Sequence, residues 1–247
     1  MFSKEEFQTW AKENVVLFAS IMTKIDGRQD DALLRDYGFG GFPSMAMLDG
    51  DGEAITKKVE RELPAMKETF AKCNAFLKTK AKVDAGEEVD AAKWFMMRLT
   101  LGQLSVAEAK EQGGDLELNE AQKVEFDQAV LALELDDLMK NYRKVGAEAT
   151  ANAVYDMFKA GRVPAAGSSS ETFFMSMLGS AADKKNDGDA YLVAGPFLLK
   201  QAQNMLKRIE GMREGYKGDP KRLETAAEQF KKQVADIEAK LESYKKT

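Results

Sequence analysis

The sequence predicts an α/β module over residues 1–82, followed by a larger all-α region over residues 86–247. Strand-like apolar runs alternate with helical patterns in the first part, and the turn signal Asp49–Gly52 indicates a β-hairpin. From about residue 86 onward, only the helical spacing of apolar residues remains. A chain of 247 residues can hold two modest domains of this kind.

The module is predicted to begin with a helix and a buried strand. The helix is expected over residues 4–13, where Ser3 and Glu6 have the spacing of an N-terminal capping box. The run Val15–Ile21 is almost entirely apolar, which is typical of a strand buried on both faces of a parallel sheet. The remaining expected elements are a short helix around residues 31–37, strands at 44–48 and 53–59, and a helix over 63–82.

The all-α region is predicted from helix caps, glycine stops and apolar stripes. Two long stripes, Leu198–Met212 and Leu223–Tyr244, are joined by a short loop and predict a terminal antiparallel helical hairpin. We expect these helices to pack within the chain, and oligomerisation through them is the alternative. No repeat of fixed length is found. The other helices are expected at residues 90–101, 105–113, 119–144, 147–160 and about 168–187.

The composition excludes several function classes. A net charge of −5 lacks the general basic footprint of a nucleic-acid-binding protein. The chain has no histidine, which removes Ser-His-Asp and Cys-His catalysis and every histidine-containing zinc site. The acidic turns at residues 49–53 and 183–189 do not have the ligand spacing of a calcium loop. We therefore expect no metal, no cofactor and no catalytic residue.

The chain has a single cysteine, Cys73. It shares a helical face with Phe70 and Leu77, which predicts a buried and inert thiol. Because thiol exchange requires two sulfurs, this chain cannot perform dithiol–disulfide chemistry by itself.

No apolar stretch is long enough to span a bilayer, and no signal-peptide pattern is visible. We expect a soluble globular protein. It would be periplasmic or secreted if a signal was removed upstream, and cytoplasmic otherwise.

A motif in the first segment carries a family resemblance. Residues 37–44 read Tyr-Gly-Phe-Gly-Gly-Phe-Pro-Ser, between a predicted short helix and a predicted strand that leads into an Asp-Gly-Asp-Gly turn. With this motif and its flanking elements, residues 2–59 resemble the thioredoxin-like superfamily. The resemblance implies that Pro43 is cis and that Gly41, Phe42 and Pro43 line a peptide groove. The alternative is a structural turn before a strand.

The resemblance is incomplete, because the Cys-x-x-Cys motif and the strand before it are both absent. Our leading hypothesis is a redox-inactive thioredoxin-like protein that acts as a protein- or peptide-binding or scaffolding module. One alternative is a fragment of a thiol–disulfide oxidoreductase whose catalytic dithiol lies upstream of Met1. Another is a purely structural protein that oligomerises through the terminal helices.

Overall fold

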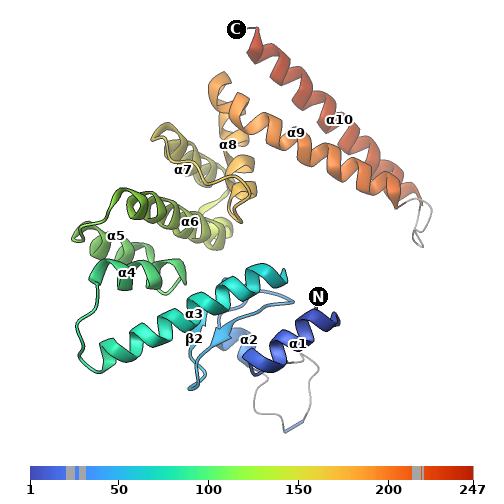
Figure 1. The fold of residues 1–247 in the computed structure, drawn as a ribbon. Coiled ribbons are helices and arrows are strands. Elements are labelled where there is room, and N and C mark those ends of the chain that lie inside the picture. The colour runs from blue at the N-terminus through green and yellow to red at the C-terminus, as the bar shows by residue number, and fades with distance from the viewer. Residues whose placement is uncertain (21–25, 28–31, 213–217, 219, 247) are drawn as a thin grey trace. The chain divides into compact units, whose positions relative to one another are not determined.

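The computed structural model describes residues 1–20, 26–27, 32–212, 218 and 220–246. The described residues are mostly helical, with 69% in helix, 2% in strand and one two-stranded hairpin among them. It divides into two compact units, Met1–Ala129 and Val130–Thr247. This division falls within one long helix, α6 (Glu120–Val145). Each unit is described by itself below (Figure 1).

The α/β fold class expected for the first segment is wrong, because the described residues hold no thioredoxin-like module. The predicted central strand does not form: residues 15–20 are not in a strand, and Val16 is 99% exposed. A strand buried on both faces needs neighbouring strands for its backbone groups, and the described residues supply only a short hairpin. Ile21, the last residue of that prediction, lies outside the described residues.

Unit 1 begins with two helices, α1 (Glu5–Asn14) and α2 (Leu33–Asp36). The N-cap of α1 is Lys4, whose side chain makes no capping hydrogen bond, so the capping box predicted at Ser3 is wrong. Phe7 and Ala11 of α1 are buried against Leu63 and Met66. The apolar spacing along the helix, rather than a cap, therefore fixes α1 to the unit.

The hairpin predicted from the Asp-Gly turn is confirmed, although it is short. Its strands are β1 (Met47–Leu48) and β2 (Ala54–Thr56), which pair antiparallel with an irregularity in register between Met47 and Leu48. The Asp49 carboxylate accepts the backbone N–H groups of Asp51 and Glu53, at 3.0 and 2.8 Å. This carboxylate therefore builds the turn itself.

The long helix α3 (Leu63–Asp84) supports the hairpin, and its predicted position is confirmed. Ile55 of β2 packs with Cys73 and Phe76 of α3 and with Leu101, which directly follows α4 (Ala91–Thr100). The side chain of Gln103 donates to the carbonyl of Ile55 at 3.0 Å. A two-stranded hairpin is marginal alone, so these contacts stabilise it.

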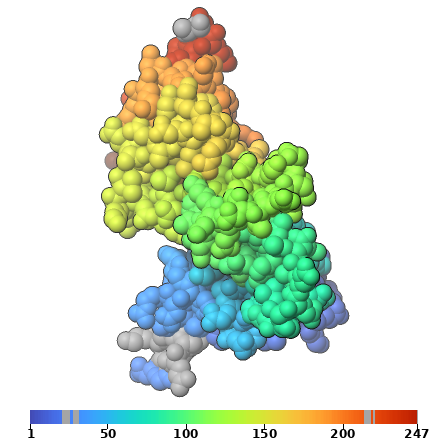
Figure 2. Space-filling model, turned by 90° about the vertical axis from the view of Figure 1, so that its left-hand side faces the viewer, coloured from blue at the N-terminus to red at the C-terminus, as the bar shows by residue number. Residues whose placement is uncertain are grey.

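The predicted capping box of α5 (Val106–Gly114) is confirmed. Ser105 accepts the N–H of Glu108, whose carboxylate in turn accepts the N–H of Ser105. Near the C-terminal end of this helix, Gly113 lies against the ring of Phe126 on α6, where a larger residue would clash. Figure 2 shows one face of this unit, with α3 in cyan and α4 and α5 in green.

The described residues of unit 2 form the second part of α6 and four further helices. These are α7 (Ala147–Lys159), α8 (Glu171–Lys185), α9 (Gly188–Gly211) and α10 (Pro220–Lys245), close to the positions predicted. Consecutive helices pack together from α7 to α10. The fully buried side chains of Leu135, Val154, Phe174 and Leu178 lie in its core. Asp219, which the sequence suggests as the N-cap of α10, lies outside the described residues.

The predicted antiparallel hairpin of α9 and α10 is confirmed. Gly188, the first residue of α9, lies against Tyr244 near the end of α10, and Gly195 lies against Leu241. The two glycines let the helices approach closely at this end. Figure 1 shows α9 and α10 side by side along their length. None of the described helices is long and apolar enough to cross a membrane.

The corner between α8 and α9 is held by polar contacts. Asp187 caps α9 by accepting the N–H of Ala190 at 3.0 Å, and it also accepts the Tyr155 hydroxyl at 2.6 Å. The hydroxyl of Tyr155 is the main cause that lowers the pKa of the Asp187 carboxyl, and the N–H of Ala190 adds to it. Asn186 makes the turn possible by adopting a left-handed backbone with φ of 53°.

Candidate peptide-binding loop

The loop that contains Gly41, Phe42 and Pro43 is fastened at both ends. At its start, the Tyr37 hydroxyl donates to the carbonyl of Gly52 in the hairpin turn at 2.6 Å. After its end, Met45 and Met47 pack against the apolar cluster of α1 and α3. The loop therefore extends from an ordered base.

The three predicted site residues lie together on the surface of unit 1. Gly41, Phe42 and Pro43 are all exposed, and the Phe42 side chain is 65% exposed. The peptide bond between Phe42 and Pro43 is cis, as the resemblance predicts. An exposed aromatic ring at the tip of a fastened loop is a suitable contact for a partner.

Hydrogen bonds occupy the carbonyls on both sides of Phe42 but leave Phe42 itself available. The Ser44 hydroxyl donates to the carbonyl of Gly41, and the Arg61 guanidinium donates to the carbonyl of Pro43 at 2.8 Å. Among the described residues, the backbone N–H and C=O of Phe42 have no partner. An extended peptide could bond to these two groups in the way that paired strands exchange hydrogen bonds.

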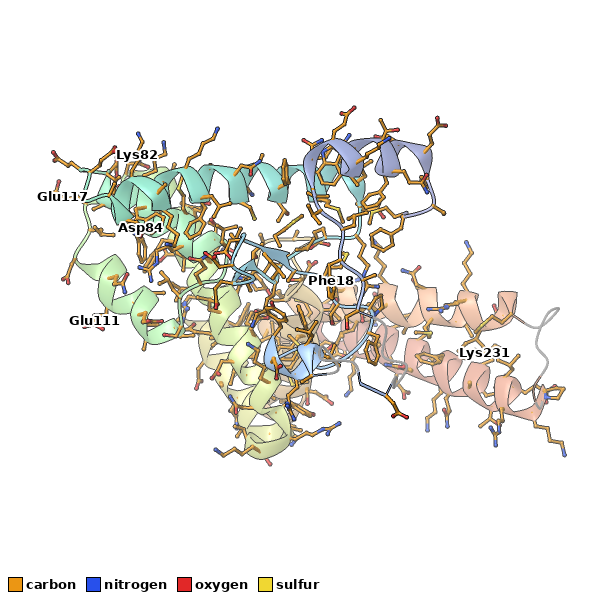
Figure 3. All side chains as sticks on the ribbon, turned by 90° about the horizontal axis from the view of Figure 1, so that it is seen from below. Phe18, Lys82, Asp84, Glu111, Glu117 and Lys231 are labelled. Carbon is orange, nitrogen blue, oxygen red and sulfur yellow. The ribbon has the colours of Figure 1, made fainter. Side chains whose placement is uncertain are left out.

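A second exposed apolar segment, Val16–Phe18, begins at the same cluster. Val15 packs against the cluster that also holds Met45 and Met47. The next three side chains are exposed, and their backbone groups form no hydrogen bond with other described residues. Phe18 is labelled in Figure 3. Sequence reasoning missed this surface, because an apolar run looks the same in a buried strand and in an exposed segment.

The single thiol of the chain, Cys73, is buried. Cys73 is 3% exposed, as predicted, and burial raises its pKa to about 11. A thiol with so high a pKa is almost entirely protonated at neutral pH and is a poor nucleophile. The burial and the raised pKa both make the Cys73 thiol unreactive at neutral pH.

The described part of unit 1 also has one shallow polar depression. A shallow depression between α1 and α3 is lined by Glu6, Trp10 and Lys67, with 3.6 Å between the Lys67 ammonium and the Glu6 carboxylate. No group of three or more acidic or cysteine side chains with metal-binding geometry occurs in the part of the chain that the structure describes.

Comparison of the chain with family models, with curated proteins and with solved structures finds no match. The resemblance of residues 2–59 to the thioredoxin-like superfamily stays an untested hypothesis. Any assignment of function therefore depends on the geometry of the chain itself.

Proposed function

We propose that this chain is a protein- or peptide-binding scaffold without thiol-exchange activity, and that it contacts its partner through Gly41, Phe42 and Pro43. The availability of Phe42 carries the proposal. Its ring is exposed and its backbone N–H and C=O are unpaired among the described residues, while both neighbouring carbonyls are already bonded. A partner in an extended conformation would cover the ring and bond to the free peptide groups.

The expected contribution of Phe42 follows from its side chain. Aromatic residues at the centre of an interface often contribute about 2 kcal/mol or more when they are truncated. This corresponds to roughly a 30-fold change in dissociation constant. Arg61 holds the adjacent carbonyl in place, so it supports the loop rather than providing the main contact.

The proposal is tested with an array of unrelated peptides about 12 residues long, which are long enough to span a standard strand. The wild-type chain, Phe42→Ser and the control Val124→Ser are compared. Val124 on α6 is also 65% exposed, so the control removes an apolar side chain with the same fractional exposure elsewhere on the surface. We expect a set of peptides that both the wild type and the control bind, and that Phe42→Ser binds roughly 30-fold more weakly.

Two results would contradict the proposal. One is an array on which Phe42→Ser binds the same peptides as the wild type with equal strength. The other is sustained reduction of insulin by this chain, since a single buried thiol cannot turn over a disulfide.

A further inference from the structure

A small depression in unit 2 lies where Tyr191 of α9 meets one face of α10. Its volume is about 260 Å³. Steps of four, three and four residues along α10, starting from Gln229, lead to Gln233, Asp236 and Lys240, so these lining side chains share one face of the helix. The depression therefore combines a buried tyrosine with several polar groups of one helix face.

Tyr191 brings to this depression a hydroxyl that has no hydrogen-bond partner among the described residues. The residue is 4% exposed, and its ring packs against Tyr244 with 5.5 Å between the ring centroids. The hydroxyls of Tyr37, Tyr155 and Tyr244 all donate hydrogen bonds to other described residues. Because a buried tyrosine normally has a partner for its hydroxyl, Tyr191 indicates a place for a polar ligand atom.

The Tyr191 hydroxyl can be reached and carries its proton. Among the described residues, the one fully enclosed side-chain polar atom without a partner is the Oγ of Ser168, so the hydroxyl oxygen of Tyr191 is not completely enclosed. Tyr191 lines the depression, which makes this oxygen accessible from it. Burial raises the pKa of Tyr191, so the hydroxyl stays protonated at neutral pH and can donate a hydrogen bond.

The charges that line the depression define the kind of ligand. The Lys240 ammonium is already bonded to the Asp183 carboxylate. Lys232 and Asp236 form no ion pair with any described residue, although they lie one helical turn apart. Lysine four residues before a carboxylate is the weaker order for pairing along a helix. The depression thus offers one cation and one anion that a ligand of both charges can pair with.

We propose that this depression binds a free α-amino acid with an apolar side chain, in its zwitterionic form. The ligand carboxylate would accept hydrogen bonds from the Tyr191 hydroxyl and the Lys232 ammonium, and the ligand ammonium would donate to Asp236. Residues one turn apart have Cβ atoms about 5–6 Å from each other, which suits two charges joined through one carbon atom. The apolar side chain would cover Ile237, which also lines the depression.

This site is separate from the loop of unit 1, and its test does not depend on peptide binding there. The probe is L-leucine, and binding to the full chain is measured by saturation-transfer difference NMR. Two analogues each lack one charge: 4-methylpentanoate has no ammonium group, and 3-methylbutylamine has no carboxylate. The protein variants are Tyr191→Phe, Lys232→Gln and Asp236→Asn. The matched control is Lys231→Gln, at the neighbouring position of α10, labelled in Figure 3, where the lysine pairs with Glu228.

We expect wild type to bind L-leucine with a dissociation constant on the order of 1 mM, as suits a small ligand in an open site. Tyr191→Phe should weaken binding about tenfold, because it removes a hydrogen bond to a charged group. It should leave the urea midpoint unchanged, since the hydroxyl bonds to no described residue. Lys232→Gln and Asp236→Asn should each weaken binding about threefold or more, and Lys231→Gln less than about twofold.

Four results would overturn the proposal. They are an absence of saturable leucine binding, binding of either analogue as strong as that of leucine, binding by Tyr191→Phe within about twofold of wild type, and equal losses in Lys231→Gln and Lys232→Gln. Equal binding of 4-methylpentanoate would identify a general carboxylate site, and equal losses in the two lysine variants would show a nonspecific effect of charge.

Discussion

Adding one methyl group at Gly195 tests how α9 and α10 fit together. A Cβ at this position would lie 2.6 Å from the Cδ2 atom of Leu241, closer than real Cβ contacts allow. Leu241 is 6% exposed and belongs to the core of unit 2, so its side chain has little room to move. Gly195→Ala therefore overpacks this crossing, while Leu241→Ala opens a cavity on the other side of the same contact.

Gly195→Ala adds volume at this contact and Leu241→Ala removes it, so their effects on the free energy of unfolding should not add. Gly195→Ala gains about 1 kcal/mol of helix propensity and loses about 2 kcal/mol to overpacking, a net loss of about 1 kcal/mol. Leu241→Ala alone should cost about 3 kcal/mol. In the double variant the added methyl enters the vacated space. The overpacking penalty disappears, and we expect a loss of about 2 kcal/mol instead of about 4 kcal/mol.

The assay is urea unfolding followed by far-UV circular dichroism. Tryptophan fluorescence is unsuitable, because Trp10 and Trp94 both lie in unit 1. The curves are fitted with a separate transition for each unit where two are resolved. Gly211→Ala is the control, since it makes the same change near the end of α9 with no atom within 4 Å. Additivity of the Gly195 and Leu241 energies within about 0.5 kcal/mol would refute the reasoning.

Three other predictions concern single groups. Cys73 should react with a thiol reagent at about pH 8 only after denaturant is added, and rapid modification of the native chain would contradict its burial and raised pKa. Ser105→Ala should lower the free energy of unfolding by about 1 kcal/mol through loss of the cap, whereas the exposed Ser169→Ala should leave it unchanged. Asp187→Ala should destabilise the chain at neutral pH. Because folding lowers the pKa of Asp187, the wild-type advantage should be lost as pH falls below the ordinary aspartate range through the lowered pKa, and a pH-independent difference in urea unfolding would argue against this.

The helices were predicted well from the sequence, because caps and apolar spacing, which specify a helix, lie within the helical segment itself. The capping box at Ser105 and the apolar stripe of α10 are examples, and both appear in the structure. The prediction of a strand at residues 15–21 was wrong because a strand depends on partners outside its own segment. An apolar run forms a buried strand only where neighbouring strands and side chains cover it. Those neighbours come from other parts of the chain, so the run alone does not show whether they are present. Val16–Phe18 consequently lies exposed beside the cluster that holds Val15.

The candidate loop was partly predictable for similar reasons. The cis bond at Phe42–Pro43 agrees with what the resemblance implies. The role of Arg61, which bonds the Pro43 carbonyl, could not be inferred, because eighteen residues separate the two in the chain.

Site-specific photo-cross-linking tests the central claim most directly. A benzophenone amino acid is placed at position 42 in one variant and at position 124 in another, since both native side chains are 65% exposed. Each variant is irradiated with a peptide that the array identifies as bound. If Phe42 contacts an extended partner, position 42 should capture the peptide and position 124 should not. Equal capture at both positions, or capture at 124 alone, would contradict the account.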